Sequence, residues 1–268
     1  MTSLADLTAG PGERHLVYGG TRTGKSSFMD WNLRHIQRTR PACMQLLADT
    51  KPRFRAETIS WGPGNRWRRD AAKAGIYATW AKGPVLPNSV QVPMDRDHPF
   101  RGMWDTDKRP GEIAIMQGGE PDEWRRMLEL MKHFTLRGFK DRERLIVVDE
   151  GMDFYQRNTM GIEPRKDVIL HAARAGGERN IGLLFGAHRP HGIPPLLNTL
   201  SSRVTLFYLK YQRDMHYLWE MGVPDEEFPP QGNYIFKQYK VAPGGIVSDP
   251  VEARFTLPDS YLKQLAAT

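Results

Sequence analysis

Short apolar runs alternate with longer segments of helical periodicity along most of this chain. Runs of four or more apolar residues, as at 145–148 and 181–187, are typical of strands buried on both faces of a parallel sheet. By contrast, 121–138 carries apolar residues at the spacing of one helix face. The alternation predicts an α/β fold, a mostly parallel central sheet flanked by helices. The predicted strands are 15–18, 44–48, 112–116, 145–148, 181–187 and 204–209, and the predicted helices are 26–39, 121–138, 165–172, about 196–200 and 214–221.

The two ends of the chain differ from its centre. Residues 1–13 are polar and finish in a Gly-Pro-Gly sequence, which predicts a flexible leader. Residues 234–241 and 246–257 alternate between apolar and polar positions around a Pro-Gly-Gly turn, which predicts a C-terminal β-hairpin. We therefore expect one domain over 14–257, followed by a short tail at 258–268.

An excess of basic residues adds a polyanionic partner to this picture. The formal net charge is +7 and the isoelectric point is about 9.5, so nucleic acid is the first candidate. The single cysteine, Cys43, excludes an intramolecular disulfide. No apolar run approaches the roughly 18 residues of a membrane span, and residues 1–13 lack the apolar centre of a signal peptide. We therefore expect a cytosolic protein without a membrane span.

Much of the positive charge falls in residues 51–110, which we expect to leave the sheet as an excursion from about residue 53. This segment holds twelve Lys and Arg against six Asp and Glu. Basic residues, Arg68 and Arg69 among them, are interleaved with tryptophans, a pattern suited to phosphate contacts and base stacking. The alternative is a small satellite core of tryptophans surrounded by solvated charges. The sequence leaves both interpretations open for Trp61, Trp67, Trp80 and Trp104.

The most specific motif is Gly-Gly-Thr-Arg-Thr-Gly-Lys-Ser at 19–26, which fits the phosphate-binding pattern G-x-x-x-x-G-K-[ST] without a mismatch. Its two fixed glycines permit a backbone path that turns successive N–H groups toward a β-phosphate. Lys25 would reach the β- and γ-phosphates, and the Ser26 hydroxyl would ligate the Mg²⁺ that bridges them. The sequence thus predicts a nucleotide phosphate site formed by Gly19, Gly20, Thr21, Arg22, Thr23, Gly24, Lys25, Ser26 and Ser27.

Two adjacent carboxylates follow the apolar run at 145–148. In a parallel sheet they would stand at the edge where the phosphates bind. Asp149 is positioned to hold Mg²⁺ through its water shell, and Glu150 can activate the attacking water as general base. Such a pair could instead cap the next helix, but the phosphate-binding motif in the same chain favours the catalytic interpretation and therefore nucleotide hydrolysis.

A further polar residue, His188, directly follows the apolar run at 181–187. A side chain at that strand end would lie next to the γ-phosphate and could respond to its loss. We therefore predict a sensor role for His188. The alternative is a structural histidine whose ring is satisfied by its neighbours.

These pieces, in this order, resemble the HerA/FtsK superfamily of DNA-pumping P-loop ATPases over residues 14–256. The motifs that carry the resemblance are 19–26, the strand end at 48–52, the apolar run and acidic pair at 145–150, the block Ala-Arg-Ala-Gly-Gly-Glu-Arg-Asn through Arg-Pro at 173–190, and the Pro-Gly turn and strand at 229–236. His188 stands where that family usually has Gln. The resemblance implies a RecA-like P-loop NTPase fold with ATP and Mg²⁺ as cofactors.

The family resemblance also implies a homo-oligomeric ring, usually a hexamer, with double-stranded DNA in its central channel. Arg174 or Arg179 would be the arginine that reaches a neighbouring subunit's site, and the sequence does not choose between them. Both could instead cap or solvate a helix end. The loop after Glu150 would face the channel with its basic residues Arg157, Arg165 and Lys166.

Because no additional module is recognisable, the chain is more similar to the packaging ATPases of membrane-containing icosahedral viruses than to other members of the superfamily. That resemblance implies a motor that moves double-stranded DNA into a preformed capsid, with a capsid portal or vertex protein as partner, in the host cytoplasm or in the virion. The alternatives are a conjugation or plasmid-transfer coupling ATPase and an assembly protein that uses nucleotide only to fix its conformation. A small-molecule kinase is the least favoured, because no acceptor site is evident.

Overall fold

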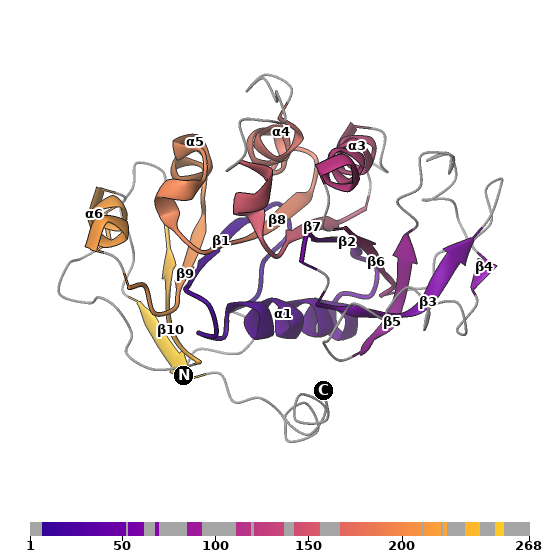
Figure 1. The fold of residues 1–268 in the computed structure, drawn as a ribbon, viewed down its shortest axis with the longest axis horizontal. Coiled ribbons are helices and arrows are strands. Elements are labelled where there is room, and N and C mark those ends of the chain that lie inside the picture. The colour runs from indigo at the N-terminus through magenta and orange to yellow at the C-terminus, as the bar shows by residue number, and fades with distance from the viewer. Residues whose placement is uncertain are drawn as a thin grey trace.

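The computed structural model describes residues 7–51, 53–61, 68–69, 85–92, 111–118, 121–136, 142–155, 167–210, 212–220, 222–223, 234–241 and 250–254. These residues form three layers, a mostly parallel sheet between helices on both of its faces (Figure 1). The predicted fold class is thereby confirmed.

The sheet contains eleven strands in the order β11-β10-β9-β1-β8-β7-β2-β6-β5-β3-β4. Its parallel centre consists of β9 (Arg203–Leu206), β1 (Arg14–Tyr18), β8 (Ile181–Ala187), β7 (Arg144–Val148), β2 (Met44–Asp49) and β6 (Ile113–Gln117). Tyr18 pairs with Ala187, and Val148 pairs with Phe185. Because these parallel strands finish within two residues of one another, the phosphate-binding motif, the acidic pair and His188 emerge at one edge of the sheet.

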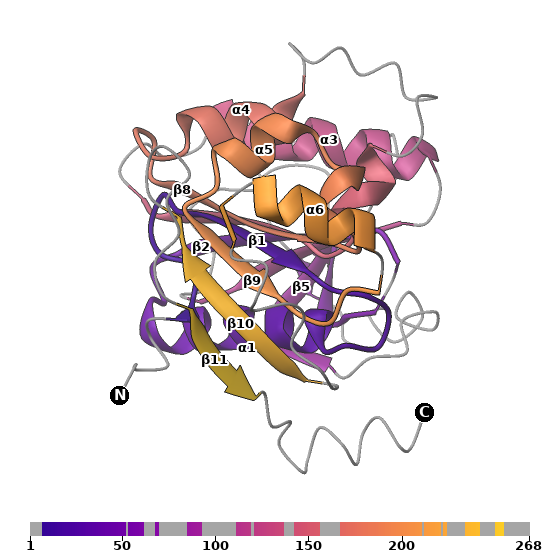
Figure 2. The same ribbon diagram turned by 90° about the vertical axis from the view of Figure 1, so that its left-hand side faces the viewer.

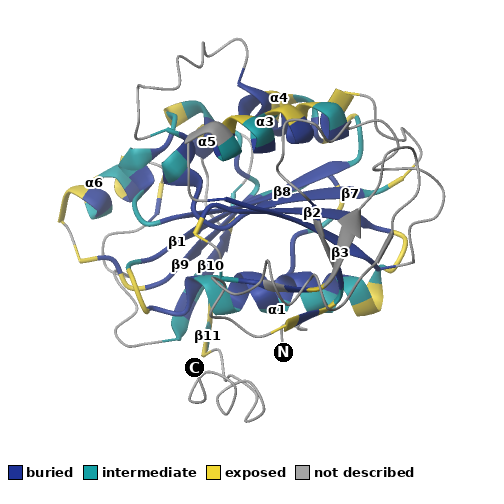
Figure 3. Ribbon diagram, turned by 45° about the vertical axis from the view of Figure 1, so that its right-hand side comes forward, coloured by how far each residue is buried: buried dark blue, intermediate teal, exposed yellow. Residues whose placement is uncertain are grey.

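The helices cover the sheet unequally. Among the described residues, one helix, α1 (Lys25–Thr39), lies on one face, and the other face carries α3 (Pro121–Leu136), α4 (Val168–Ala175), α5 (Pro195–Thr199) and α6 (Gln212–Glu220) (Figure 1). Successive residues of a strand enter opposite cores: Leu16 packs toward the four helices and Val17 toward α1. Both are fully buried, as are most residues of the central strands (Figure 3). This two-sided burial explains why the strands read as continuous apolar runs.

Part of the segment at 51–110 continues the sheet instead of leaving it. Within it, β3 (Arg55–Trp61) and β5 (Val85–Val92) pair in parallel, β5 pairs with β6, and the short β4 (Arg68–Arg69) lies antiparallel to β3. The alternation of β5 is interrupted by Pro87 and by Asn88, whose φ is 48°, and the β3–β5 register shifts between Ala56 and Thr58. Because of these irregularities, the pattern of apolar and polar residues in this segment did not indicate strands. The other tryptophans of the segment, Trp67, Trp80 and Trp104, lie outside the described residues.

The described residues near both chain ends pack at the side of the sheet next to β9. β10 (Ile235–Lys240) and β11 (Val251–Arg254) form the predicted C-terminal hairpin, and β10 joins β9 in antiparallel (Figure 2). The tail at 258–268 lies outside the described residues. Residues 7–13 of the expected flexible leader are packed: Leu7 and Ala9 are buried in the core on the α1 side, and the Ala9 N–H donates to Asn32 Oδ1 at 3.2 Å.

Candidate active site

The motif at 19–26 forms the loop that connects β1 to α1. Gly24 precedes the first helical residue with φ of 110°, a left-handed conformation that favours glycine. A Cβ at Gly24 would also lie 2.7 Å from the Tyr234 ring, and a Cβ at Gly19 would lie 2.7 Å from Phe207 Cβ. The fixed glycines are therefore required both by the backbone path and by the close packing of Tyr234, just before β10, and Phe207, just after β9, against the loop.

The buried Lys25 joins this loop to the acidic pair after β7. Its ammonium group donates to the backbone carbonyl of Asp149 at 2.9 Å and to Glu150 Oε1. β8 lies between β1 and β7 in the sheet, so the lysine spans one strand to make these contacts. The ammonium and the carboxylate thereby lie above the sheet edge where a nucleotide phosphate would bind.

The carboxylate of Glu150 is surrounded by positively charged groups and hydrogen-bond donors. In addition to Lys25 on one oxygen, Lys51 Nζ lies 3.2 Å and His188 Nε2 2.8 Å from the other oxygen, Oε2. Burial alone would raise the pKa of Glu150, but the hydrogen bond from His188 and the ammonium of Lys25 outweigh it and hold that pKa well below its usual range. Glu150 is therefore ionised, as a general base must be.

His188 links Glu150 to the phosphate-binding loop. While Nε2 contacts the Glu150 carboxylate, Nδ1 lies 3.2 Å from the carbonyl oxygen of Gly19. The ring therefore lies between two hydrogen-bond acceptors, the Glu150 carboxylate and the Gly19 carbonyl oxygen. The backbone after Glu150 is held equally closely, because a Cβ at Gly151 would lie 1.8 Å from Phe185 Cζ. The position of Glu150 thus depends on Phe185 of β8 and on His188, which directly follows that strand.

The oxygen atoms of Ser26 and Asp149 fit the predicted Mg²⁺ site. Ser26 Oγ lies 3.4 Å from Asp149 Oδ2, and the buried Asp149 Oδ1 has no hydrogen-bond partner among the described residues. Hydroxyl and carboxylate oxygens are the ligands that Mg²⁺ prefers. The guanidinium of Arg53 contacts the same two side chains, donating to Ser26 Oγ and lying 3.4 Å from Asp149 Oδ2.

A second buried carboxylate, Asp49 at the end of β2, adjoins this site. Its Oδ2 accepts the backbone N–H groups of Arg53 at 2.7 Å and Phe54 at 2.9 Å. Burial, and next the nearby Asp149 carboxylate, raise the pKa of Asp49 to about 7 against the opposing effect of these N–H groups. The sequence indicated a polar end of β2, but it did not predict that Asp49 and Arg53 would lie beside the predicted metal ligands.

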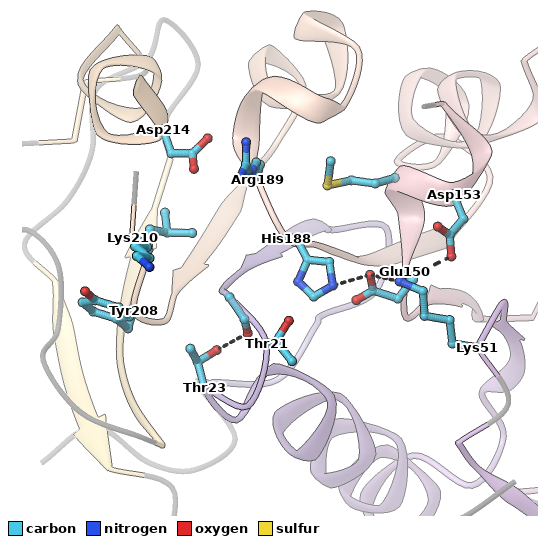
Figure 4. A pocket seen from close by; sticks show the side chains of 13 residues that line it. Thr21, Thr23, Lys51, Glu150, Asp153, His188, Arg189, Tyr208, Lys210 and Asp214 are labelled. Carbon is cyan, nitrogen blue, oxygen red and sulfur yellow. Dashed lines mark hydrogen bonds and ion pairs between the residues drawn. The ribbon is translucent and has the colours of Figure 1, made fainter. Parts of the chain in front are cut away.

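A cavity of about 540 Å³ opens above the phosphate-binding loop (Figure 4). Thr21 and Thr23 of the loop border it together with Glu150 and His188, and Lys51 reaches in from the loop after β2. On the far side, Tyr208 and Lys210 follow β9. The cavity therefore extends from Glu150 across the loop, as a nucleotide polyphosphate site requires.

The remaining residues predicted from sequence are not at this cavity. Arg174 is exposed in the last turn of α4, and Arg179 lies in the turn before β8. The seven-residue strand β8 separates Arg179 from His188, a distance of about 20 Å at 3.3 Å per residue. Neither arginine lines the cavity of its own chain. Arg157, Arg165 and Lys166 lie outside the described residues, and Arg68 and Arg69 form β4 at the opposite end of the sheet.

Comparisons with known proteins place this geometry in a recognised fold. No protein-family model and no curated protein matches the sequence. The genome packaging NTPase B204 of Sulfolobus turreted icosahedral virus 2, solved with ATP-gammaS, superposes with a TM-score of 0.53 at 12% identity, over 92% of this chain and 99% of B204. Its complex with sulfate gives a TM-score of 0.58 at 11% identity, over 92% and 98% of the two chains.

A secretion ATPase shares the same fold. The cytoplasmic domain of the type VII secretion ATPase EccC from Thermomonospora curvata superposes with a TM-score of 0.51 at 14% identity, over 94% of this chain and 26% of that one. Among the described residues, no helix is both long and apolar enough to cross a bilayer.

Because B204 and EccC superpose over most of this chain, the chain has the fold of the P-loop ATPases. The resemblance to the HerA/FtsK superfamily indicated by its motifs is borne out at the level of the fold.

Proposed function

We propose that this protein is a Mg²⁺-dependent ATPase whose turnover drives the movement of double-stranded DNA. The observation that carries the proposal is the convergence of Lys25, Glu150 and His188 at one edge of the sheet. The lysine and the histidine both contact the Glu150 carboxylate, and the histidine also reaches the phosphate-binding loop. A lysine, a general base and a γ-phosphate sensor are the groups that nucleotide hydrolysis requires.

In the proposed reaction, Glu150 accepts the proton of the water that attacks the γ-phosphate. Lys25 moves its ammonium group from Glu150 to the β- and γ-phosphates, which frees one carboxylate oxygen for the water. His188 keeps its contact with the other oxygen and orients the base. Loss of the γ-phosphate changes the surroundings of the imidazole, and His188 passes that change to Gly19 and the loop.

Ser26 and Asp149 are the residues proposed to hold Mg²⁺. When bound, the ion would neutralise negative charge on the phosphates. The protein contributes a hydroxyl and a buried carboxylate held 3.4 Å apart. The backbone carbonyl of Asp149 also accepts a hydrogen bond from the Lys25 ammonium. The same turn after β7 therefore positions both the proposed metal ligand and the proposed phosphate-binding lysine.

Arg174 or Arg179 would complete the site of a neighbouring subunit. Arg179 lies about 20 Å from the His188 of its own chain, across the length of β8, and neither arginine lines the cavity of its own chain, which favours a role in trans. An arginine supplied in trans neutralises charge in the transition state. We therefore propose a homo-oligomeric ring, a hexamer by resemblance, in which an isolated subunit hydrolyses ATP slowly.

The DNA partner is proposed from the charge of the chain and from its resemblances. The net charge of +7 favours a polyanion, with Arg157, Arg165 and Lys166 after Glu150 as channel residues and Arg68 and Arg69 as further candidates. B204 is a viral genome packaging NTPase, and its chain is covered almost completely. We therefore propose genome packaging into a preformed capsid, docked on a portal or vertex protein, in the host cytoplasm or the virion.

The test is steady-state ATP hydrolysis with and without long double-stranded DNA, for the wild type and for Glu150→Gln. The variant keeps the size and one acceptor oxygen of the side chain but cannot take up a proton. We expect DNA to stimulate the wild type, and the variant to lose turnover by about 10³-fold while still binding a labelled ATP analogue. Turnover that is indifferent to DNA would contradict the motor. Nucleotide binding without turnover in either protein, at concentrations that favour assembly, would instead favour the assembly protein.

A further inference from the structure

Arg53 lies between the two side chains proposed to hold the metal. Its guanidinium donates to Ser26 Oγ through Nη1, and the same nitrogen lies 3.4 Å from Asp149 Oδ2. These two oxygens are themselves 3.4 Å apart. A single cationic group thus bridges the oxygen pair that a divalent cation would have to bind.

The backbone of Arg53 is held independently of its side chain. Asp49 Oδ2 accepts the N–H of Arg53 and that of Phe54, and it also accepts Nε2 of Gln117 at 3.0 Å. Phe54 is buried in the core on the α1 side. The guanidinium is therefore presented from an anchored stretch of chain, and its removal would leave this anchor in place.

The guanidinium offsets the negative charge of nearby buried carboxylates. Asp149 and Asp49 are both fully buried, and a buried carboxylate is costly without a positive partner. The ammonium groups of Lys25 and Lys51 both contact a different carboxylate, that of Glu150. Arg53 supplies the positive charge in contact with the side chain of Asp149.

We propose that Arg53 competes with the divalent cation for Ser26 and Asp149, and that the metal displaces it when it enters with the nucleotide. This inference rests on the metal site of the proposed function. A free cation must replace a charge-assisted contact, which weakens its binding. A nucleotide brings phosphate oxygens that bind the metal and also accept the released guanidinium. Arg53 thereby couples occupation of the metal site to occupation of the phosphate site.

The experiment measures Mn²⁺ binding to the full-length chain by electron paramagnetic resonance, first without nucleotide. We expect Arg53→Ala to bind Mn²⁺ about tenfold more tightly than the wild type. Arg53→Lys, which keeps the charge but not the planar donor set, should lie between them. The matched control is Arg34→Ala, because Arg34 contacts Asp30 at 2.9 Å and is 28% exposed, close to the 37% of Arg53. This control should leave Mn²⁺ affinity unchanged.

The same titration in the presence of a non-hydrolysable ATP analogue tests the coupling. The affinity difference between wild type and Arg53→Ala should then shrink. An unchanged difference, or an Arg53→Ala variant that binds Mn²⁺ no more tightly than the wild type, would overturn the proposal. Asp149→Asn separates this failure from failure of the metal site. If it abolishes Mn²⁺ binding while Arg53→Ala has no effect, the site stands and Arg53 is not a competitor. If Asp149→Asn leaves binding intact, the metal lies elsewhere and both proposals are overturned.

Discussion

The imidazole of His188 and the carboxylate of Glu150 are joined by a 2.8 Å contact between Nε2 and Oε2, although the two residues follow different strands. Because the other ring nitrogen faces the carbonyl oxygen of Gly19, the ring connects the proposed base to the phosphate-binding loop. Neither β7 nor β8 alone contains this connection. It arises where adjacent parallel strands finish at the same edge of the sheet.

Replacing His188 should test whether its hydrogen bond orients Glu150. His188→Ala removes both contacts, and we expect ATP turnover to fall by about 10²-fold. His188→Gln can still donate to Glu150, and it should retain turnover within about tenfold of the wild type. The matched control is His191→Gln. His191 has the same exposure, 27%, and its carboxylate partner is Asp214. Steady-state hydrolysis of all four proteins decides the point, and full turnover in His188→Ala would contradict a role in orienting Glu150.

Mixing two inactive variants should reveal whether an arginine acts on a neighbouring chain. Glu150→Gln retains both arginines but lacks the base, whereas Arg179→Ala retains the base. If the arginine acts in trans, a mixture contains interfaces that combine an intact base with an intact arginine, and it should regain part of the wild-type turnover. The parallel mixture with Arg174→Ala identifies which of the two residues is required. An arginine that acts in cis predicts that no mixture exceeds the sum of its components.

The site residues that lie within short contiguous motifs could be predicted from the sequence. The fixed glycines, Lys25 and the acidic pair lie within short contiguous motifs, and strand register places them together. Arg53 was not predictable, because its contact with Asp149 depends on β2 being the neighbour of β7. Strand β5 was hidden for a different reason, since Pro87 interrupts its alternation. The packing of Leu7 likewise depends on a core formed by residues distant in the sequence.

Gly151→Ala should damage both stability and turnover. Its added Cβ would lie 1.8 Å from Phe185 Cζ, so the ring or the turn after Glu150 must move. We expect a loss of about 1–3 kcal/mol in the free energy of unfolding. Turnover should fall with it, because Glu150 precedes the displaced residue. Gly177→Ala is the control: Gly177 is exposed, its nearest contact is Arg14 Nη1 at 3.4 Å, and the expected change is within about 0.5 kcal/mol.

A double variant makes the Gly151 prediction sharper. If the clash with the Phe185 ring is the cause, the double variant Gly151→Ala, Phe185→Leu should lose less free energy of unfolding than the two single variants lose together. Urea denaturation of the four proteins gives the coupling free energy. Strict additivity would mean that the loss comes from the backbone of Gly151 and not from its contact with Phe185.

The buried His15 should make the folded protein less stable as the pH falls below about 6.5. Burial, and next the positive charge of Arg203, hold the pKa of His15 well below its usual range. The ring is fully buried, and its Nε2 contacts Thr205 Oγ1 at 2.7 Å. The unfolded chain therefore takes up a proton first as the pH falls, and this uptake favours unfolding.

The variant His15→Gln keeps a polar contact with Thr205 but does not titrate. We expect the free energy of unfolding of the wild type to fall relative to the variant by roughly 1 kcal/mol between about pH 7.5 and 5.5. Urea midpoints at constant ionic strength measure this difference, and other titrating groups cancel because both proteins share them. Parallel curves would show that the folded protein accommodates the protonated ring. A gap that widens on the alkaline side would contradict the sign of the pKa shift itself, because above about pH 6.5 the ring is neutral in both the folded and the unfolded chain.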